Sequence, residues 1–185
     1  MDDRNSAVEL VERLTRIVAN EGHAQGLKPA QWEALRYLAR ANRFSRTPGA
    51  LTAYLGLTKG TVSQTLMALE RSGFIEKTAN PGDARSVRLG LSPAGADLLR
   101  RDGIDTLRRA FDGLPAEVQA ALGDGLERLV KAGLAARGGR AFGVCRTCRH
   151  FVADAGGAGR HFCALLKEQL SDGDAELICH EQEAA

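Results

Sequence analysis

The sequence predicts a mainly helical fold with one small β-hairpin and a cysteine-rich C-terminal segment. Apolar residues recur at helical spacing through most of the first 136 residues, and a short alternation of period two interrupts them at residues 86–91. All four cysteines lie in the last 41 residues. At 185 residues the chain is long enough for one full core with a small appendage.

The first two helices are predicted at residues 6–22 and 29–42, separated by glycines. In the first helix, the apolar positions one turn apart are Leu10, Leu14, Ile17 and Val18. In the second, which Pro29 opens, the inward stripe is expected to be Trp32, Leu35, Leu38 and Ala39. Trp32 and Tyr37 are interpreted as core residues in preference to groups that stack on a ligand.

Residues 47–73 predict a short helix, a tight turn and a longer helix. Thr47 can cap the first helix, and Pro48 suits its first position. Gly56 ends that helix, Thr58 can cap the second one, and Gly73 ends it. The residues expected to face inward are Leu51, Leu55, Leu57, Val62, Leu66 and Leu69.

The opposite face of the second helix carries small, polar or basic residues. The candidate DNA contacts on it are Thr58, Lys59, Gly60, Thr61, Ser63, Gln64 and Arg71. Gly60 allows close approach of the backbone, Gln64 can bond a base edge, and Lys59 can reach a phosphate. A DNA recognition helix requires such a face, although a helical hairpin with an ordinary solvated face is the alternative.

A β-hairpin is predicted directly after this helix, with strands at residues 74–78 and 86–91 and a turn-rich loop at 79–85. Val87, Leu89 and Leu91 share one face of the second strand. Arg85 at the hairpin tip can enter a minor groove, and Arg88 is the second basic candidate. The combination predicts a winged helix-turn-helix.

Two further helices are predicted after the hairpin, one from Ser92-Pro93 to about residue 112 with a kink at Gly103, and one at 115–136. The apolar stripe of the last helix is Val118, Leu122, Leu126, Leu129 and Val130. Because the winged helix already supplies a core, we interpret helix 6–22 and these two helices as a dimer interface.

The run from Pro29 to about Leu99 resembles the MarR family of winged helix-turn-helix regulators. The resemblance rests on Leu-Gly-Leu-Thr-Lys-Gly-Thr-Val-Ser-Gln at residues 55–64, Leu-Glu-Arg-Ser-Gly-Phe-Ile at 69–75 and Asp83-Ala84-Arg85. It implies a homodimer, a pseudo-palindromic DNA site and, usually, repression relieved by a ligand or a modified cysteine. Residues 1–136 are then the MarR-like domain, with a DNA-binding core at about 29–99.

Charge is distributed unevenly along a chain whose formal net charge is +2. Residues 43–101 carry a net +5 and residues 144–185 a net −3, so the basic part coincides with the candidate DNA-binding face. The sequence shows no leader and no long apolar run, which favours the cytoplasm and no membrane partner. The sequence contains no nucleophile–base set and no phosphate-binding loop, so no pattern in it indicates an enzyme.

Residues 137–143 are expected to be a linker to a tail at 144–185 that binds a metal. The ligands are Cys145, Cys148, Cys163 and Cys179, in the spacing C-x2-C-x14-C-x15-C. A Cys-x-x-Cys pair can share one centre, and two more cysteines complete four ligands. A segment with so few large apolar groups needs the stability that a metal contributes. A redox dithiol or inert cysteines are the alternatives.

The cysteine pattern is similar to that of the small high-potential iron–sulfur proteins. The resemblance implies a 4Fe-4S cluster in a pocket partly formed by Phe151, Phe162, Leu165 and Leu166. Zinc bound by the same cysteines is the close alternative. The histidines beside the cysteines, His150, His161 and His180, are expected more often to support the ligands than to replace one.

These patterns together predict a homodimeric, sequence-specific transcription regulator, in particular a repressor, that binds double-stranded DNA. Its metal centre either senses redox state or iron, or holds the tail folded. The alternative is an electron-transfer or redox module whose winged helix docks a protein partner. Binding to duplex DNA that weakens steeply with salt would separate these two functions.

Overall fold

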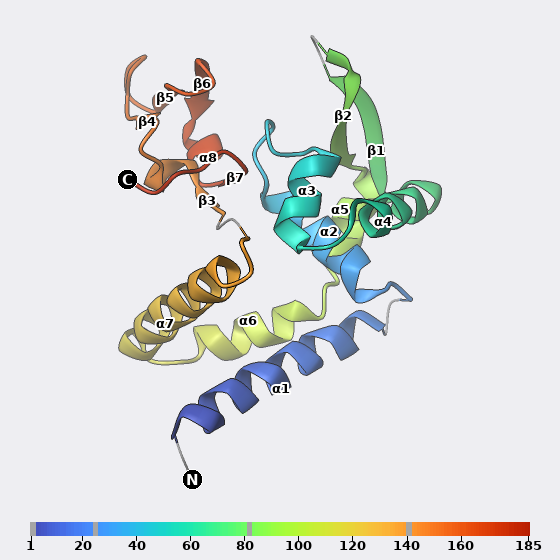
Figure 1. Cartoon of the computed structure of the whole chain (residues 1–185), viewed down its shortest axis with the longest axis vertical. Helices are drawn as coiled ribbons and strands as arrows, with labels where there is room; N and C mark the ends of the chain where they lie inside the picture. The colour runs from blue at the N-terminus through green and yellow to red at the C-terminus, as the bar shows by residue number, and fades with distance from the viewer. Residues whose placement is uncertain (1–2, 24–25, 81–82, 140–141) are drawn as a thin grey trace.

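The structure is a computed structural model that describes residues 3–23, 26–80, 83–139 and 142–185. The helices are α1 (Asp3–His23), α2 (Pro29–Arg40), α3 (Pro48–Leu55), α4 (Lys59–Arg71), α5 (Pro93–Leu99), α6 (Ile104–Asp112), α7 (Ala116–Ala135) and α8 (Asp172–Ala175), with a 3-10 turn at Cys145–Thr147. The strands are β1 (Ile75–Asn80), β2 (Asp83–Leu91), β3 (Gly143–Val144), β4 (Phe151–Val152), β5 (Arg160–Cys163), β6 (Glu168–Ser171) and β7 (Ile178–Cys179). Helices α1, α6 and α7 lie together at one end of the molecule, below the winged helix and the tail (Figure 1).

The predicted cap residues hold the starts of three helices. The Thr47 hydroxyl accepts from the N–H of Ala50 at 3.2 Å, and the Thr58 hydroxyl accepts from the N–H of Thr61 at 3.2 Å. The Ser92 hydroxyl does the same for α5, at 3.0 Å from the Gly95 nitrogen. Because each bond satisfies an otherwise unpaired donor, these short sequence signals fix where α3, α4 and α5 begin.

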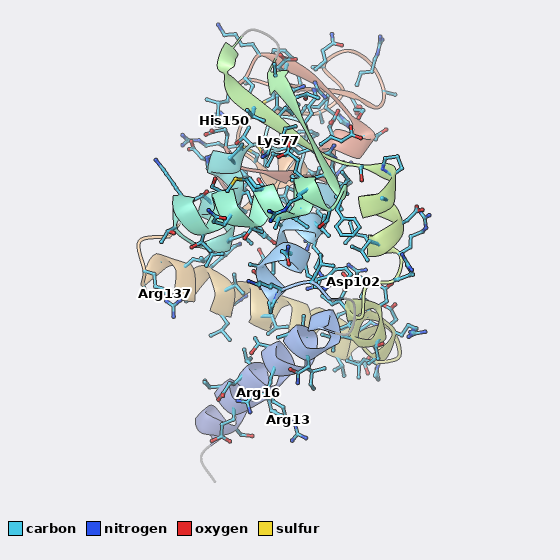
Figure 2. All side chains as sticks on the ribbon, turned by 90° about the vertical axis from the view of Figure 1, so that its right-hand side faces the viewer. Arg13, Arg16, Lys77, Asp102, Arg137 and His150 are labelled. Atoms are coloured by element: carbon cyan, nitrogen blue, oxygen red, sulfur yellow. The ribbon has the colours of Figure 1, made fainter. Side chains whose placement is uncertain are left out.

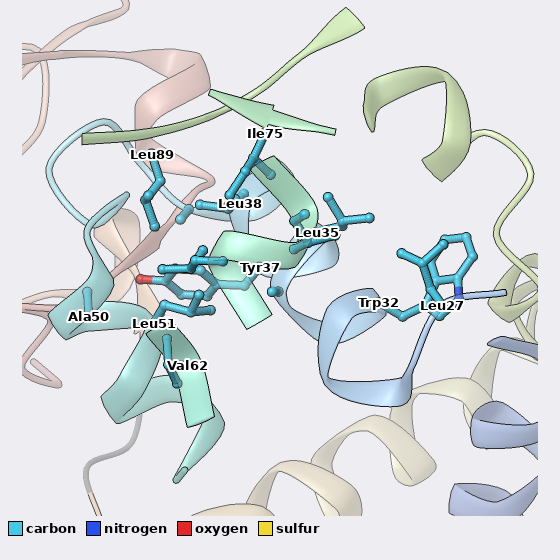
Figure 3. Close-up of a cluster of buried hydrophobic side chains, with 14 of the residues drawn as sticks. Leu27, Trp32, Leu35, Tyr37, Leu38, Ala50, Leu51, Val62, Ile75 and Leu89 are labelled. Atoms are coloured by element: carbon cyan, nitrogen blue, oxygen red, sulfur yellow. The ribbon is translucent and has the colours of Figure 1, made fainter. Parts of the chain in front are cut away.

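The main core lies between α2, α3, α4 and the hairpin (Figure 3). Trp32 and Tyr37 are each 1% exposed, which confirms their interpretation as core residues. The Tyr37 hydroxyl donates to the Ser45 carbonyl at 2.7 Å, so its polar end is satisfied inside the core. Ala39 was wrongly expected in the inward stripe. It is exposed, and Ala34, one turn from Leu38 and fully buried, occupies the inward side.

Strands β1 and β2 form the predicted hairpin, paired antiparallel from Ile75 with Leu91 to Ala79 with Val87. The predicted loop at 79–85 is wrong in extent, because pairing continues with Asn80 opposite Asp83. A register shift between Ala79 and Asn80 takes up the extra residues of β2, which a period-two pattern cannot show.

The predicted single helix from residue 93 to 112 is wrong, because α5 and α6 are separate helices. Between them lies the buried carboxylate of Asp102, which accepts from Arg36 Nε at 2.7 Å and from Arg36 Nη2 at 2.6 Å. It also accepts from the N–H of Ile104 at 3.1 Å, at the start of α6. Figure 2 shows the position of Asp102 beside these two helices. The bond to α2 therefore fixes a break where the sequence suggested only a kink at Gly103.

The Asp102→Ala variant is expected to lower the free energy of unfolding by about 3 kcal/mol, because it leaves a largely buried guanidinium without its partner. Burial alone raises the pKa of Asp102, but the bonds from Arg36 and the Ile104 N–H outweigh it and hold that pKa below its usual value. The stabilisation is therefore complete above about pH 4 and is lost as the pH falls through the lowered pKa.

Urea denaturation at one fixed protein concentration measures this effect. Asp97→Ala is the matched control, because Asp97 makes an exposed ion pair with Arg100 on α5. Loss of this ion pair is expected to lower the free energy of unfolding by less than about 1 kcal/mol. Equal losses in the two variants would contradict the structural role of Asp102.

The tail packs against the winged helix. Strand β3 pairs with β7, and β4, β5 and β6 form a three-stranded sheet. Ile178 of β7 belongs to the main core, and the ring of Phe142 lies edge-on to Tyr54 with centroids 5.2 Å apart. Phe142, in the stretch predicted as a linker, thus contacts the winged helix directly.

Candidate nucleic-acid interface and cysteine site

The outward face of α4 is exposed as the sequence predicted. All seven candidate residues, Thr58, Lys59, Gly60, Thr61, Ser63, Gln64 and Arg71, are exposed, while the stripe on the opposite side is buried in the core. A Cβ added at Gly60 would meet only the Thr58 hydroxyl, at 3.8 Å. The packing of the protein therefore does not require glycine there, whereas close approach of another molecule would.

A groove of about 380 Å³ lies between α3, α4 and the hairpin. Its basic side chains are Lys59 at the start of α4 and Lys77 on β1. Lys77 lies beside α4 (Figure 2). Its ammonium group lies 2.5 Å from the Glu70 carboxylate of that helix. Sequence reasoning missed Lys77, although its position two residues after the buried Ile75 places it on the strand face toward α4.

The two basic residues predicted on the hairpin differ in what the structure describes. The side chain of Arg85 lies outside the described residues, as does that of Asp83. Arg88 lies opposite Thr78 in the ladder, is partly buried and has an interaction partner within the protein. The DNA-binding roles of Arg85 and Arg88 stay predictions.

Helices α1 and α7 expose apolar faces without a partner in the described part of the chain. The large apolar residues that are more than a third exposed on them are Val8, Leu10, Leu14, Ile17, Val118, Leu122, Leu126, Leu129 and Val130. So wide an apolar surface is typical of a protein–protein interface. None of the described helices is long and apolar enough to cross a membrane.

An apolar cavity of about 330 Å³ lies between these helices and α2. It is lined by Val11, Leu14, Thr15, Val18, Ala19, Pro29, Trp32, Glu33, Arg36, Leu107 and Leu126. Burial raises the pKa of Glu33, against the opposing effect of Arg36. The carboxyl of Glu33 at the edge of an apolar wall makes this cavity chemically distinct from the open groove at α4.

The four cysteines line one small cavity, although they come from three separate places in the tail: the 3-10 turn and its C-cap, β5 and β7. Phe151 and Leu165 line it as predicted, whereas Phe162 and Leu166 do not, and Leu170 of β6 takes their place. Phe162 was placed wrongly because Cys163 follows it on β5, so the two side chains point to opposite faces.

Each cysteine sulfur receives at least one hydrogen-bond donor. Cys145 accepts from Asn42 Nδ2 at 3.3 Å, Cys148 from the N–H of Glu183 at 3.5 Å, and Cys163 from the N–H of Leu166 at 3.5 Å. Cys179 accepts from the side chains of Asn42 and Ser45 and from the backbone of Glu181. Such donors commonly surround the sulfurs that hold a metal centre, and they orient these ligands.

Cys145 and Cys179 are in hydrogen-bond contact with each other. The Cys145 thiol donates to Cys179, which lowers the pKa of Cys179 to about 6 and raises that of Cys145. Burial of both groups works in the raising direction. The contact therefore helps one sulfur of the pair to carry a thiolate charge.

The geometry of the cavity constrains what these sulfurs can hold. Within the described residues, no three His, Cys, Asp or Glu side chains are placed to hold one metal ion. Tetrahedral zinc needs four sulfurs at about 2.3 Å from one point, so a single-ion site is not preformed. The cavity is also small, about 10 Å³, so it must widen to accept a 4Fe-4S cluster. The four sulfurs are thus suitable ligands for a metal centre. They must move to bind either a zinc ion or a 4Fe-4S cluster.

The histidines near the cysteines occupy different surroundings. His161 is buried, 3.0 Å from the Asp172 carboxylate, and accepts from the N–H of Asp154 at 3.1 Å. His150 lines the cysteine cavity. His180 stacks on Phe142, and its buried Nδ1 has no hydrogen-bond partner among the described residues.

Residues 25–86 match the model of the MarR family. The chain has a MarR-like winged-helix fold. It is similar to S. aureus MepR in a DNA complex, with 18% identity, a TM-score of 0.57 and coverage of 71% of this chain and 98% of that one. It is also similar to Streptococcus pneumoniae FabT in complex with DNA, with 25% identity, a TM-score of 0.54 and coverage of 70% and 96%.

A MarR transcriptional regulator from Methanosarcina mazei Go1 is similar as well, with 20% identity, a TM-score of 0.57 and coverage of 73% and 99%. No curated protein matches the sequence. These similarities cover nearly all of each solved chain but leave more than a quarter of this one outside. The MarR-like fold therefore accounts for the larger part of the chain.

Proposed function

We propose that the protein is a sequence-specific, DNA-binding transcriptional regulator that acts as a homodimer and represses its targets. The observation that carries the proposal is the exposed small, polar and basic face of α4 beside the hairpin. Net charge of +5 over residues 43–101 supports the same role. MepR and FabT, which share the fold, are both named as complexes with DNA.

The apolar faces of α1 and α7 support the homodimer. A second copy of the chain would cover them, and a two-fold axis would place two α4 helices on one side of the assembly. Two such helices can enter successive major grooves about 34 Å apart. The proposed DNA site is therefore pseudo-palindromic.

Leu129→Glu is expected to weaken the dimer by at least tenfold, because it places a charge on the proposed apolar interface. Sedimentation over a range of protein concentrations measures the effect. Ala120→Glu is the matched control, because nine residues, or two and a half helical turns, separate it from Leu129 and place it on the opposite face of α7. Equal dissociation constants for the two variants would refute this interface.

Selection of duplexes from a random DNA library by the full chain tests the DNA-binding function. The expected result is an enriched sequence with two inverted half-sites whose centres lie about 10 base pairs apart. A library that yields no enriched sequence would contradict sequence-specific binding, and it would leave the electron-transfer alternative as the better explanation.

The four cysteines are proposed to bind a metal centre, with a 4Fe-4S cluster favoured and zinc as the alternative. Hydrogen-bond donors on the sulfurs support a bound metal centre. The cysteine spacing, which is similar to that of the small high-potential iron–sulfur proteins, favours the cluster over zinc. When bound, a cluster would supply electron exchange or sensitivity to oxygen and iron. Its role as a sensor, and the cytoplasmic location, stay predictions.

A further inference from the structure

The stretch between α2 and α3, residues 41–47, lies between the cysteine tail and the winged helix (Figure 1). We refer to it as the 41–47 segment. Ala41 forms a bridge with Ile178 of β7, and the N–H of Asn42 donates to the Ile178 carbonyl at 2.9 Å. The N–H of His180 donates to the Ser45 hydroxyl at 2.8 Å. The backbone around Cys179 is therefore bonded to this segment on both sides.

Side chains of the 41–47 segment also reach the cysteines themselves. Asn42 Nδ2 donates to Cys145 at 3.3 Å, and both Asn42 and Ser45 bond Cys179. Each of these two polar residues is only 1% exposed. Two of the four sulfurs thus depend on donors from the winged-helix part of the chain.

The side chain of Asn42 shapes the segment as well. Its Oδ1 accepts from the N–H of Phe44 at 3.1 Å and from the N–H of Ser45 at 2.9 Å. One amide group therefore holds the local turn with its oxygen and a cysteine sulfur with its nitrogen. A change at the Cys145 sulfur would therefore disturb the hydrogen bonds of this turn, because a buried amide has no water with which to replace a lost bond.

The other end of the segment holds the elements proposed to bind DNA. The Arg46 carbonyl accepts from the N–H of Leu89 on β2 at 2.7 Å. Thr47 caps α3 through the N–H of Ala50. Within seven residues, the chain thus connects the cysteine site to the hairpin and to the first helix of the helix-turn-helix.

Contacts of the charged side chain of Arg43 also attach the tail to the 41–47 segment. Arg43 lies 2.8 Å from the Asp174 carboxylate and 3.7 Å from that of Glu168, and it donates to the Gln169 carbonyl at 2.5 Å. The acidic tail is therefore held to the basic winged helix by contacts on the same segment. These contacts require the folded form of β6, α8 and β7.

We propose that the 41–47 segment couples occupancy of the cysteine site to DNA binding. A thiolate-bound metal centre keeps β7 and the segment in place, and so fixes α3 and the hairpin in the form that binds DNA. Loss of the metal frees the segment and weakens binding, because ordering it then costs conformational entropy. By reciprocity, DNA binding strengthens metal binding by the same factor. This coupling rests on the proposed function.

Hydrogen exchange of the full chain, purified without oxygen and compared before and after removal of its metal by a chelator, tests the coupling without DNA. The expected result is faster exchange in the tail and also at Leu89 and Ala50, with α1 unchanged. Faster exchange confined to the tail would overturn the proposal.

Binding to a duplex selected by the wild-type protein provides the second test. Metal-loaded wild type is expected to bind at least fivefold more tightly than the stripped form, within the usual range of coupling between sites. Ser45→Ala removes the hydroxyl that joins His180 and Cys179 to the segment. The affinity of its fully loaded form should therefore exceed that of its stripped form by less than twofold. Ser72→Ala, at an exposed position after α4, is the matched control.

A second variant, Asn42→Asp, keeps the oxygen that holds the turn but places a carboxylate against Cys145. It is expected to weaken metal retention against a chelator at least tenfold, whereas Asn20→Asp, exposed on α1, should leave it unchanged. The coupling would be overturned if loaded and stripped wild type bound DNA equally tightly. It would also be overturned if Ser45→Ala kept the affinity ratio of the wild type between loaded and stripped forms. Either result would leave the DNA-binding function intact. Absence of all DNA binding would instead refute the proposed function, and hydrogen exchange would still decide the coupling.

Discussion

The Gly60→Glu variant is expected to lose specific DNA binding, with affinity reduced at least 100-fold. Gly60 lies in the first turn of α4, on the face proposed to enter the major groove. A longer side chain there prevents close approach, and its carboxylate repels the phosphates. The fold should survive, because the added Cβ meets only the Thr58 hydroxyl, at 3.8 Å.

Fluorescence anisotropy with the selected duplex measures this loss, and urea denaturation checks the fold. Ala94→Glu is the matched control, since it adds the same charge at an exposed position on α5. It should reduce affinity by no more than a few-fold. If Gly60→Glu bound as tightly as Ala94→Glu, the outward face of α4 would not be the DNA-binding surface.

The Cys163→Ser variant is expected to lose nearly all metal, because a serine hydroxyl is a poor substitute for a thiolate. Cys163 comes from β5, whereas the other three cysteines come from the 3-10 turn and β7. Its loss should therefore also loosen the three-stranded sheet of the tail. Iron, sulfide and zinc assays, with an absorption spectrum of protein purified without oxygen, measure the loading.

Ala164→Ser is the control for this variant, since it adds a hydroxyl at the adjacent exposed position and leaves every sulfur in place. It should keep the metal content of the wild type. Full metal content in Cys163→Ser would refute the assignment of four cysteine ligands. If the wild type is colourless and holds one zinc per chain, the assignment of four cysteine ligands stands and the bound metal is zinc instead of a cluster.

The helix-turn-helix could be predicted because its signals are local. Thr47, Thr58 and Ser92 each cap the helix that follows within three residues, and Gly56 takes the left-handed conformation, with φ of 62°, that ends α3. The exposed face of α4 follows from helical spacing alone. Bonds between neighbours in sequence leave a pattern that a single chain displays.

The features that the sequence did not predict depend on residues far apart in the chain. The break between α5 and α6 depends on Arg36, 66 positions before Asp102. The attachment of the tail depends on Asn42 and Cys145, which are 103 positions apart. The spacing of the cysteines within the tail groups them as ligands of one centre. No spacing rule connects them to their donors in the winged helix.

The salt dependence of duplex binding by the 185-residue chain tests the central proposal most directly. A dimer that contacts about six phosphates should lose roughly 1,000-fold in affinity for the selected duplex between about 50 and 200 mM salt. An unrelated duplex of equal length should bind far more weakly at both concentrations. Affinity that is absent, or that is unchanged by salt, would contradict the proposal that this protein regulates transcription by binding DNA.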